Sequence, residues 1–356
     1  MKLLITGGCG FLGSNVAASY LDQGAEVVVV DALLRIGGED NLRWLEKRAT
    51  KSRLIHYNVD VADDAALDAV IKKEAPFDYV CHLSGQVAMT TSIANPRRDF
   101  ETNALGTFNV LEAIRAYSPD SFVAYSSTNK VYGDLLQIEY LEKEKRYTVP
   151  SHPDGFDETL PLDFASPYGC SKGAADQYVR DWYRNFGLRT VVFRHSSIYG
   201  GRQFSTKDQG WIGWFCQQAL TQADAHRLGQ PPVPFTIAGT GKQVRDVLHA
   251  EDLIRLYHDA YLQREKVVGQ VFNVGGGMPN SLSLLELFDR LADLLAIPPL
   301  RFEKTPARKS DQKVFIADVR RLNDTLGWSP RVSCAAGLET MLEWLREQSK
   351  PNVTQC

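Results

Sequence analysis

A glycine-rich turn near the start of the chain constrains its fold more than any other feature. The apolar run LLIT is followed by three glycines, Gly7, Gly10 and Gly13, the last two of which open the helical pattern GFLGSNVAASYLDQG. A second apolar run, AEVVVVD, comes next. This order of strand, turn, helix and strand predicts a nucleotide-binding βαβ unit. The helix start would offer a pyrophosphate unpaired N–H groups and a partial positive charge. The glycines are spaced three and three, not the commoner two and three. A glycine-rich turn alone is a weak motif, but this one follows a strand and opens a helix.

The alternation of apolar runs and helical patterns continues along the first half of the chain. RLIHYNVD, DYVCHLSG and SFVAYSS have the composition of buried strands, and AALDAVIKKE and NALGTFNVLEAIRAY have helical periodicity. Strands that are apolar on both faces and separated by helices indicate a parallel sheet covered on both sides. We therefore expect an α/β fold, a Rossmann-type doubly wound parallel sheet with a smaller mixed α/β substrate domain.

The length of 356 residues fits one large unit plus a smaller one. The pattern becomes irregular after the buried strand TVVFRHSSIYG, at residue 200, which suits the smaller unit. We assign residues 1–193 and 243–273 to the dinucleotide-binding domain, 194–242 and 274–347 to the substrate domain, and 348–356 to a tail. A polar insertion at 134–165 joins two segments of catalytic character. Loops of this length are usually functional or disordered, and we favour a substrate-side flap.

Composition excludes several classes of partner. The net charge is −3 with no block of like charge, which argues against nucleic acid. No apolar run reaches membrane-spanning length, and MKLLITGG is too short for the apolar region of a leader, so we expect a cytoplasmic protein with no membrane partner. No CxxC pair or His–Cys spacing suggests a metal. We expect free thiols and interpret Cys170 as a small core residue rather than a nucleophile; the cysteines are Cys9, Cys81, Cys170, Cys216, Cys334 and Cys356.

Acidic residues at two strand ends bear on the choice of dinucleotide. Asp31 lies 18 residues beyond Gly13, at the end of the second apolar run. A carboxylate there binds ribose hydroxyls and repels a 2′-phosphate, which favours NAD over NADP. Arg35 keeps NADP open as the lesser alternative. Asp60 ends the third strand and either reaches the adenine or caps the following helix.

A tyrosine and a lysine four residues apart predict the catalytic centre. Tyr168 and Lys172 share one helix face, and Thr128 lies upstream in YSSTNKVYG. A nearby ammonium and a positive nicotinamide both favour phenolate, so we expect the pKa of Tyr168 to fall below that of free tyrosine. The phenolate would take a proton from a sugar hydroxyl while hydride leaves the same carbon. Lys172 would also hold the nicotinamide ribose, and Thr128 would orient the reacting oxygen. A lone YxxxK is usually surface decoration, but here it follows a βαβ unit.

These motifs together resemble the extended short-chain dehydrogenase/reductase superfamily over nearly the whole chain. The resemblance is carried by TGGCGFLGS, HLSGQ, NALGTFNVLEA, YSSTNKVYG, SPYGCSKGAADQY and VRDVLHAEDL. More narrowly, HLSGQVAMTTSIANP, FRHSSIYGGRQF, DQGWIGWFCQ and SDQKVFIAD are similar to the epimerases that act on C2 of a CDP-sugar. The resemblance implies tightly held NAD, a CDP-sugar between the domains, and a homodimer or homotetramer paired through the helix with the Tyr–Lys motif.

The resemblance also implies site residues. The catalytic trio would be Thr128, Tyr168 and Lys172. The residues expected to bind the cofactor are Gly7, Gly10, Phe11, Leu12, Gly13, Asp31, Asp60, Val61, Leu83, Ser84, Gln86, Asn103, Ser126, Tyr168, Lys172 and His195. Those expected to bind substrate are Thr128, Asn129, Ser197, Gln209, Trp211, Arg245 and Arg308; no residue is assigned to a metal. Arg245 and Arg308 would suit the pyrophosphate, with a surface salt bridge as the alternative for each.

Two departures from relatives refine the expected reaction. Sugar 4,6-dehydratases commonly carry an acid directly after the catalytic Thr, where this chain has Asn129 and Lys130. An elimination would lack its usual acid, so we discount dehydration. Ser197 stands where many relatives carry Asn, which puts the phosphate contacts of those relatives in doubt here.

The C2 chemistry of the implied substrate requires oxidation and reduction. No carbonyl adjoins C2, so no side chain can deprotonate its C–H bond directly, whereas transient oxidation to a 2-keto sugar and hydride return to the other face inverts the centre. The sugar pocket must accept both poses. Trp211, Trp214 and Phe215 either wall that pocket or pack the domain junction, and Tyr147 and Phe156 are weaker candidates for the same wall.

Two alternative functions remain open. The first is another nucleotide-sugar epimerase on the same scaffold, such as a CDP-glucose 2-epimerase or a UDP-sugar 4-epimerase. The second is a non-catalytic NAD-binding regulator, which is disfavoured because the chain keeps both Tyr168 and Lys172.

Overall fold

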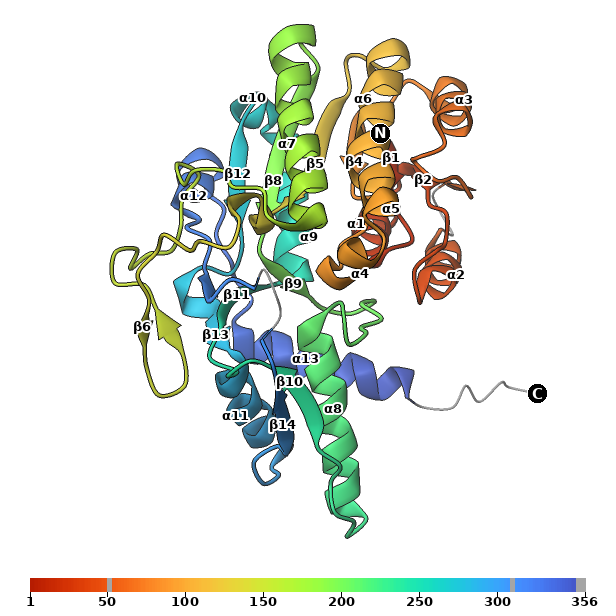
Figure 1. The fold of residues 1–356 in the computed structure, drawn as a ribbon. Helices are drawn as coiled ribbons and strands as arrows, with labels where there is room; N and C mark the ends of the chain where they lie inside the picture. The colour runs from red at the N-terminus through yellow and green to blue at the C-terminus, as the bar shows by residue number, and fades with distance from the viewer. Residues whose placement is uncertain (50–52, 308–310, 350–356) are drawn as a thin grey trace, which may run out of the picture.

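A seven-stranded parallel sheet forms the centre of the larger part of the molecule (Figure 1). The computed structural model describes residues 1–49, 53–307 and 311–349. All neighbouring strands in this sheet are parallel. In spatial order they are β12 (Val271–Val274), β8 (Arg189–His195), β5 (Phe122–Thr128), β4 (Tyr79–His82), β1 (Lys2–Thr6), β2 (Glu26–Val30) and β3 (Leu54–Tyr57). The predicted fold class is confirmed.

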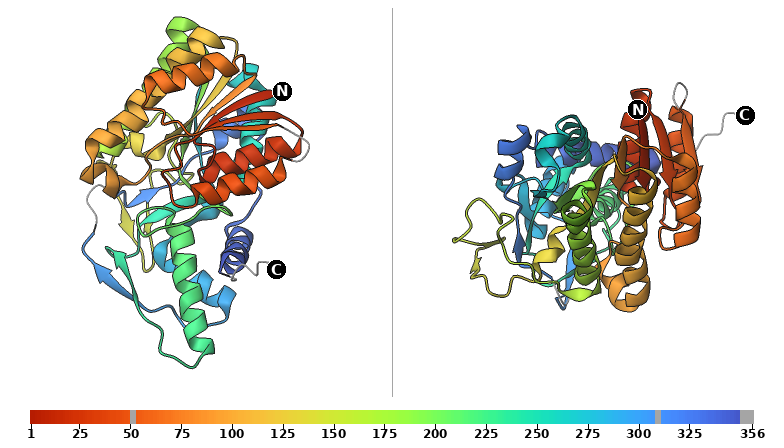
Figure 2. Two further views of the ribbon diagram at one scale, coloured as in Figure 1. Left: turned by 90° about the vertical axis from the view of Figure 1, so that its right-hand side faces the viewer. Right: turned by 90° about the horizontal axis from the view of Figure 1, so that it is seen from above.

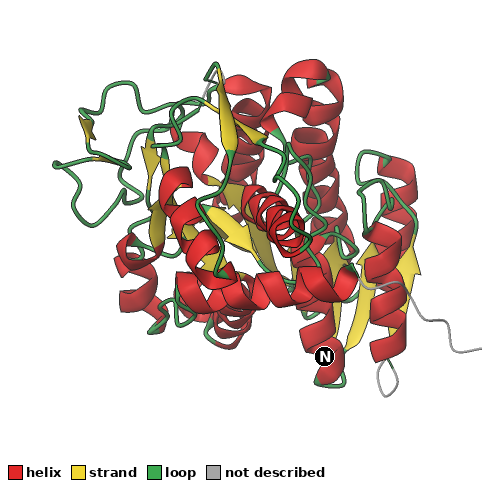
Figure 3. Cartoon of the chain, turned by 90° about the horizontal axis from the view of Figure 1, so that it is seen from below, coloured by secondary structure: helices red, strands yellow, loops and turns green. Residues whose placement is uncertain are grey.

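Two helical layers cover the sheet because its strands are apolar on both faces (Figures 2 and 3). Leu3 and Ile5 of β1 face one layer and Leu4 faces the other, as expected for alternating side chains. One layer contains α1 (Phe11–Asp22), α2 (Gly38–Arg48), α9 (Ala250–Leu262) and α12 (Arg320–Leu326). The other contains α3 (Asp64–Glu74), α6 (Gly106–Tyr117) and α7 (Ser166–Phe186).

Short helical segments connect the strands on the catalytic side of the sheet. Between β4 and α6 lie α4 (Met89–Ala94), α5 (Pro96–Phe100) and a π-helix, η1 (Glu101–Leu105). The 3₁₀-helix η2 (Asn129–Tyr132) follows β5 directly. The long helix α7 has Pro167 in its first turn and ends at Gly187, whose φ of +72° is the left-handed conformation that commonly terminates helices. The helix α10 (Arg264–Val267) precedes β12.

The smaller part lies beside the carboxyl ends of the central strands and has its own apolar core (Figure 1). Its strands are β9 (Ser197–Tyr199), β11 (Val244–His249), β13 (Ser281–Ser283) and β15 (Val314–Phe315) in one sheet, and β10 (Phe235–Ala238) with β14 (Phe302–Thr305) in another. Its helices are α8 (Trp211–Arg227), α11 (Leu284–Leu295) and α13 (Cys334–Gln348), with the 3₁₀-helix η3 (Met278–Asn280) beside them.

The segment 243–273 contributes to both parts. β11 pairs with β9, β13 and β15 of the smaller part, whereas α9 packs on α1 and β12 completes the central sheet. The predicted domain boundaries remain a prediction, but the pairing of β11 differs from the assignment of this strand to the central sheet's domain.

The insertion at 134–165 includes a small hairpin, β6 (Leu141–Glu142) and β7 (Tyr147–Thr148). Leu135, Val149 and Phe156 are buried in an apolar cluster with Phe315 of β15. The Tyr147 N–H donates to the carbonyl of Lys242 at 3.0 Å. The insertion is therefore docked on the smaller part through both apolar and backbone contacts.

Candidate active site

The glycine turn between β1 and α1 has the close backbone contacts that its sequence predicted. Gly7 has a φ of +70°, and a Cβ there would lie 2.7 Å from the nitrogen of Ser84, at the end of β4. A Cβ on Gly13 would lie 2.0 Å from the Gly7 oxygen. Helix α1 begins at Phe11, and its N-cap Gly10 gives no side-chain cap, so the N–H groups of the first turn, including that of Leu12, face the turn without intrahelical partners. This cradle fits a pyrophosphate.

Asp31 is held beside this turn by two backbone groups. Its Oδ2 accepts from the Cys9 N–H at 2.9 Å and its Oδ1 accepts from the Leu33 N–H at 2.8 Å. Its strand β2 neighbours β1, so the carboxylate lies at the same sheet edge as the glycines. A fixed negative charge next to the pyrophosphate cradle fits the ribose hydroxyls of NAD. The exposed side chain of Arg35 follows in the same loop.

Asp60 is not a helix cap, so that alternative is wrong. The N-cap of α3 is Asp63, whose carboxylate accepts from the Ala66 N–H. Asp60 instead pairs with the guanidinium of Arg98. The next residue, Val61, is buried against Gly106 of α6. A contact of Asp60 with adenine remains a prediction.

The three predicted catalytic residues converge at the carboxyl end of β5. Thr128 is the last residue of β5, and its hydroxyl offsets part of the rise that burial causes in the pKa of Tyr168 of α7. Lys172 Nζ donates to the Ser126 carbonyl at 2.5 Å and lies 4.4 Å from the centre of the Tyr125 ring. Tyr168 and Lys172 are only 8% and 4% exposed. The helix spacing of four thus places both groups in one buried site.

The pKa shift of Tyr168 in the protein alone is opposite to the predicted one. Burial raises the pKa of Tyr168 to about 12, and the hydrogen bond with Thr128 offsets this only in part. Burial also lowers the pKa of Lys172 to about 7. Both shifts favour the uncharged forms, because desolvation penalises phenolate and ammonium alike. The prediction overestimated the effect of the ammonium, and the positive nicotinamide on which it also relied belongs to the bound cofactor.

His195 ends β8 opposite Thr128 and is buried. Its Nδ1 lies 3.1 Å from Ser126 Oγ, while its buried Nε2 has no hydrogen-bond partner among the described residues. Burial, with the charge of Lys172, lowers the pKa of His195 to about 3, so the ring is neutral at physiological pH. An unsatisfied nitrogen beside Lys172 suits a polar group of a bound cofactor.

A polar network behind the catalytic pair was missed at the level of sequence. Asp99 of α5 accepts from Ser171 Oγ at 2.5 Å and from Asn103 Nδ2 at 3.2 Å. Asn103, which was predicted to bind the cofactor, also exchanges two hydrogen bonds with the backbone of Gln86. PRRDFETN suggests a charged surface segment, and only the tertiary packing of α5 on α7 reveals the burial of Asp99.

A second buried network anchors α7 to the sheet. Asp176 accepts two hydrogen bonds from Arg194 at 2.9 Å each and one from Ser127 Oγ at 2.7 Å. Arg194 also donates to the Tyr132 hydroxyl at 3.0 Å. The side chains of Arg194 and Asp176 are 3% and 0% exposed. The network ties together α7, β5, β8 and η2, which carry the catalytic groups.

The predicted substrate residues lie on the side of the smaller part. Asn129 Nδ2 donates to Gln312 Oε1 at 2.9 Å, and Gln312 in turn donates to the Gly133 carbonyl. Arg245 Nη2 donates to Asp311 Oδ1 at 2.8 Å. Arg308 lies outside the described residues.

The first residue of α8 and the loop before it contribute two of the predicted substrate residues, Trp211 and Gln209. Trp211 Nε1 donates to Ser197 Oγ at 3.1 Å, which joins α8 to β9. Gln209 bridges to Thr206, and its Oε1 is buried without a partner among the described residues. Ser197 lies two residues beyond His195, so its bond with Trp211 brings the start of α8 close to the end of β8.

Several aromatic candidates pack in cores rather than open space. Phe215 is buried in the core of the smaller part, and Trp214 packs against that core. Phe156 is 1% exposed and lies 5.7 Å from the ring of Phe315. Tyr147 is half-buried under the ammonium of Lys313.

The interpretation of Cys170 as a core residue is wrong. Cys170 is exposed, because two residues beyond Tyr168 on a helix face away from it. Its thiol lies 3.4 Å from the Phe164 carbonyl.

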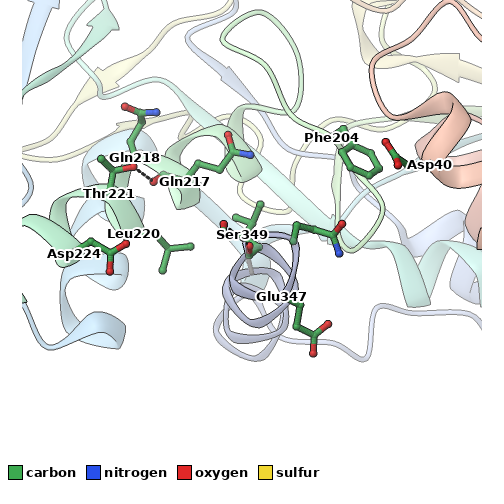
Figure 4. Close-up of a pocket in the computed structure, with 11 residues that line it drawn as sticks. Asp40, Phe204, Gln217, Gln218, Leu220, Thr221, Asp224, Glu347 and Ser349 are labelled. Atoms are coloured by element: carbon green, nitrogen blue, oxygen red, sulfur yellow. Dashed lines mark hydrogen bonds between the residues drawn. The ribbon is translucent and has the colours of Figure 1, made fainter. Parts of the chain in front are cut away.

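A groove of about 920 Å³ lies away from this site, between α8, α13 and the segment around Phe204 (Figure 4). Its lining includes Gln217, Thr221 and Ser349 but none of the catalytic trio. Within residues 1–49, 53–307 and 311–349, no group of three His, Cys, Asp or Glu side chains could hold a metal ion. In those same ranges no helix is both long and apolar enough to cross a membrane.

The glycine cradle, the anchored Asp31 and the buried Tyr–Lys pair define an NAD-dependent enzyme of the short-chain dehydrogenase/reductase type. The chain belongs to the NAD dependent epimerase/dehydratase family, whose model matches residues 3–275. The predicted superfamily and cofactor are thereby confirmed.

Curated relatives and solved structures agree with this assignment. The chain is 54% identical to a CDP-paratose 2-epimerase from Salmonella typhi over 97% of this chain and 99% of that protein. It is 31% identical to a dTDP-glucose 4,6-dehydratase from Neisseria meningitidis serogroup B, over 96% of this chain and 92% of that protein. The solved UDP-glucose 4-epimerase of Thermotoga maritima, with UDP-glucose, has a TM-score of 0.81 and 28% identity and covers 98% of this chain and 100% of its own. The dehydratase DesIV of Streptomyces venezuelae, with NAD and TYD bound, has a TM-score of 0.78 and 27% identity, and covers 98% of this chain and 97% of its own.

Proposed function

We propose that this enzyme epimerises C2 of a CDP-sugar and converts CDP-paratose to CDP-tyvelose. The 54% identity to the Salmonella typhi epimerase supports the substrate. The single observation that carries the reaction type is at Asn129. Its amide follows Thr128 and is held by Gln312, so the acid that an elimination needs is absent from that position. Oxidation and return of hydride at one carbon need no such acid.

The residues of the site divide the proton and hydride work. NAD, when bound, would supply a hydride acceptor for oxidation of C2 and a hydride donor for its reduction. Tyr168, as phenolate, takes the proton of the C2 hydroxyl when the C–H bond breaks, which leaves a 2-keto sugar. Thr128 holds the reacting oxygen, and Lys172 stabilises the phenolate. After the sugar has turned its other face, Tyr168 returns its proton to the carbonyl oxygen.

We propose that residues of the smaller part bind the nucleotide. Arg245 would exchange Asp311 for the pyrophosphate, because a guanidinium fork suits phosphate oxygens. Ser197, Gln209 and Trp211 would line the sugar. This leaves the diphosphate as a fixed anchor about which the sugar turns.

We also propose that a second copy of the chain covers the exposed face of α6 and α7. Phe108, Tyr178 and Phe186 are exposed there by 37%, 43% and 51%. Three large apolar groups on two packed helices favour burial against a partner. Sedimentation of Tyr178→Glu should show monomers where the parent shows dimers or tetramers, and unchanged sedimentation would reject this face. The cytoplasmic location stays a prediction.

The central test is incubation of the purified enzyme with CDP-paratose in heavy water without added NAD, followed by NMR at C2. Inversion without deuterium at C2 would support retained cofactor, direct hydride return and the substrate together. Inversion with deuterium at C2 would defeat the hydride mechanism. No reaction, even with NAD supplied, would favour CDP-glucose or a UDP-sugar as substrate.

A further inference from the structure

A buried carboxylate lies next to the catalytic pair and takes no part in the mechanism above. Asp99 of α5 is 0% exposed. Ser171, which donates to it at 2.5 Å, lies in α7 between Tyr168 and Lys172 and also contacts the Tyr168 carbonyl at 3.2 Å. The carboxylate is therefore fixed directly to the helical turn that carries both catalytic side chains.

The same carboxylate is connected to the loop that follows β4. Asn103 donates to Asp99 and accepts from the Gln86 N–H at 2.9 Å. A Cβ on Gly85 would lie 3.0 Å from Asn103 Oδ1 and 3.8 Å from Lys172 Nζ, so this loop passes close to the ammonium. Asn103 reaches both sides from the π-helix η1, a form that is frequent at functional sites.

We propose that Asp99 is a positioning residue whose negative charge, fixed to α7 through Ser171, keeps a proton on the Tyr168–Lys172 pair. Burial raises the pKa of Asp99, and the Ser171 hydrogen bond and the charge of Lys172 oppose this rise. Both oxygens of Asp99 accept hydrogen bonds, which suits the ionised form. Because the site is buried, its charge acts on the pair with little screening. Burial is the largest cause of both pKa shifts; the charge of Asp99 opposes the fall in the pKa of Lys172 and adds to the rise in the pKa of Tyr168.

The other charged and titratable groups around Lys172 differ from Asp99. Asp176, one turn further along α7, also raises the pKa of Lys172, and by more than Asp99 does, but it is already paired with Arg194. His82 of β4 and His195 of β8 are buried, and desolvation lowers the pKa of each to about 3, so both are neutral. The hydrogen bonds of Asp99 come from neutral groups, so its charge is not offset by an arginine.

This role has a consequence for an enzyme that must return the proton it takes. Without Asp99, the pair would lose a proton at lower pH, and the phenol needed for the return step would be depleted. This consequence rests on the proposed function, whereas the titration of the pair does not.

The test compares the holoenzyme with Asp99→Asn, which keeps the size of the side chain and removes its charge. The near-ultraviolet absorbance of phenolate is titrated in each, and the titration of its Tyr168→Phe derivative is subtracted to isolate Tyr168. The Tyr168 transition should move to lower pH by about one unit in Asp99→Asn, and the acid limb of kcat should move with it. If the parent holoenzyme does not epimerise the CDP-sugar but the Tyr168 transition still shifts in Asp99→Asn, the proposed function is rejected and the role of Asp99 is kept.

Controls separate this role from a structural one. Asp252→Asn alters another buried carboxylate, on α9, which accepts from the Arg331 and Val332 N–H groups and pairs with Arg255. This control should leave the Tyr168 transition in place. If Asp99→Asn does not fold, Ser171→Ala should give a smaller shift in the same direction, because loss of that hydrogen bond makes Asp99 easier to protonate. An unchanged or upward-shifted transition in the folded variant would overturn the proposal.

Discussion

The two sides of the active site hold their polar groups differently. On the sheet side, Lys172, Asp99 and Asp176 are all at least 96% buried and bonded to several elements. On the smaller part's side, Arg245 pairs with Asp311, and their side chains are 14% and 29% exposed. The first arrangement fixes atoms that move a proton, and the second can exchange a partner for a ligand. An epimerase needs both, because its proton chemistry must be rigid while its sugar turns.

The sheet side should be the more sensitive of the two, and Tyr168→Phe should have the largest effect. Loss of the acid–base hydroxyl should lower kcat by about a thousandfold, within the range for general acid–base groups. The ring still fills the buried space, so thermal stability and bound NAD should be retained. Turnover is measured by NMR at C2, and NAD by absorbance of the denatured protein. Turnover near that of the parent would contradict the assignment of Tyr168 as the acid–base group.

Asp176→Asn should show that the sheet side is also the structural anchor. It leaves the buried guanidinium of Arg194 without a charged partner, which should reduce the free energy of unfolding by about 3 kcal/mol. Urea denaturation measures the change. The control is Asp224→Asn, whose exposed pair with Arg227 should be worth less than about 1 kcal/mol. Equal effects for the two variants would show that burial of the Asp176 pair does not matter.

The sequence predicted the features that depend on local spacing. The strand–turn–helix order placed Gly7 and Gly13, and the interval of four placed Tyr168 and Lys172 on one face of α7. Features that depend on packing between distant segments were missed. An example is the hydrogen bond between Asn129 and Gln312, which are 183 residues apart in the sequence. In the protein alone burial raises the pKa of Tyr168, a contribution that cannot be read from four neighbouring residues.

Charge and composition also misled where burial decided the outcome. Asp99 sits among exposed charged residues in the sequence yet is fully buried, whereas the apolar-seeming Cys170 is exposed. Both outcomes follow from which face α5 and α7 present to each other. No periodicity over so short a helix as α5 defines that face.

On the smaller part's side, Arg245→Ala should weaken binding more than turnover. A charge-assisted hydrogen bond contributes about 1.5–3 kcal/mol, so KM for the CDP-sugar should rise about 10- to 100-fold with kcat changed little. The measurement is steady-state kinetics with CDP inhibition as a second measure of binding. Arg227→Ala, an exposed arginine of α8, is the matched control. A fall in kcat at constant KM would move Arg245 from the anchor to the chemistry.

The smallest effect is expected for Trp211→Phe, which keeps an aromatic wall and removes one donor. Its indole Nε1 is bonded to Ser197 Oγ at 3.1 Å, and a neutral hydrogen bond contributes about 0.5–1.5 kcal/mol, so kcat/KM should fall about 2- to 10-fold. Ser197→Ala removes the other partner of the same bond, and the double variant should be little worse than either single one if the bond is what matters. Independent, additive losses of kcat/KM would mean that Trp211 and Ser197 each form a separate hydrogen bond with the sugar. In that case the smaller part's side would hold the sugar by more directional contacts than a turning sugar allows, and the contrast between the two sides of the site would fail.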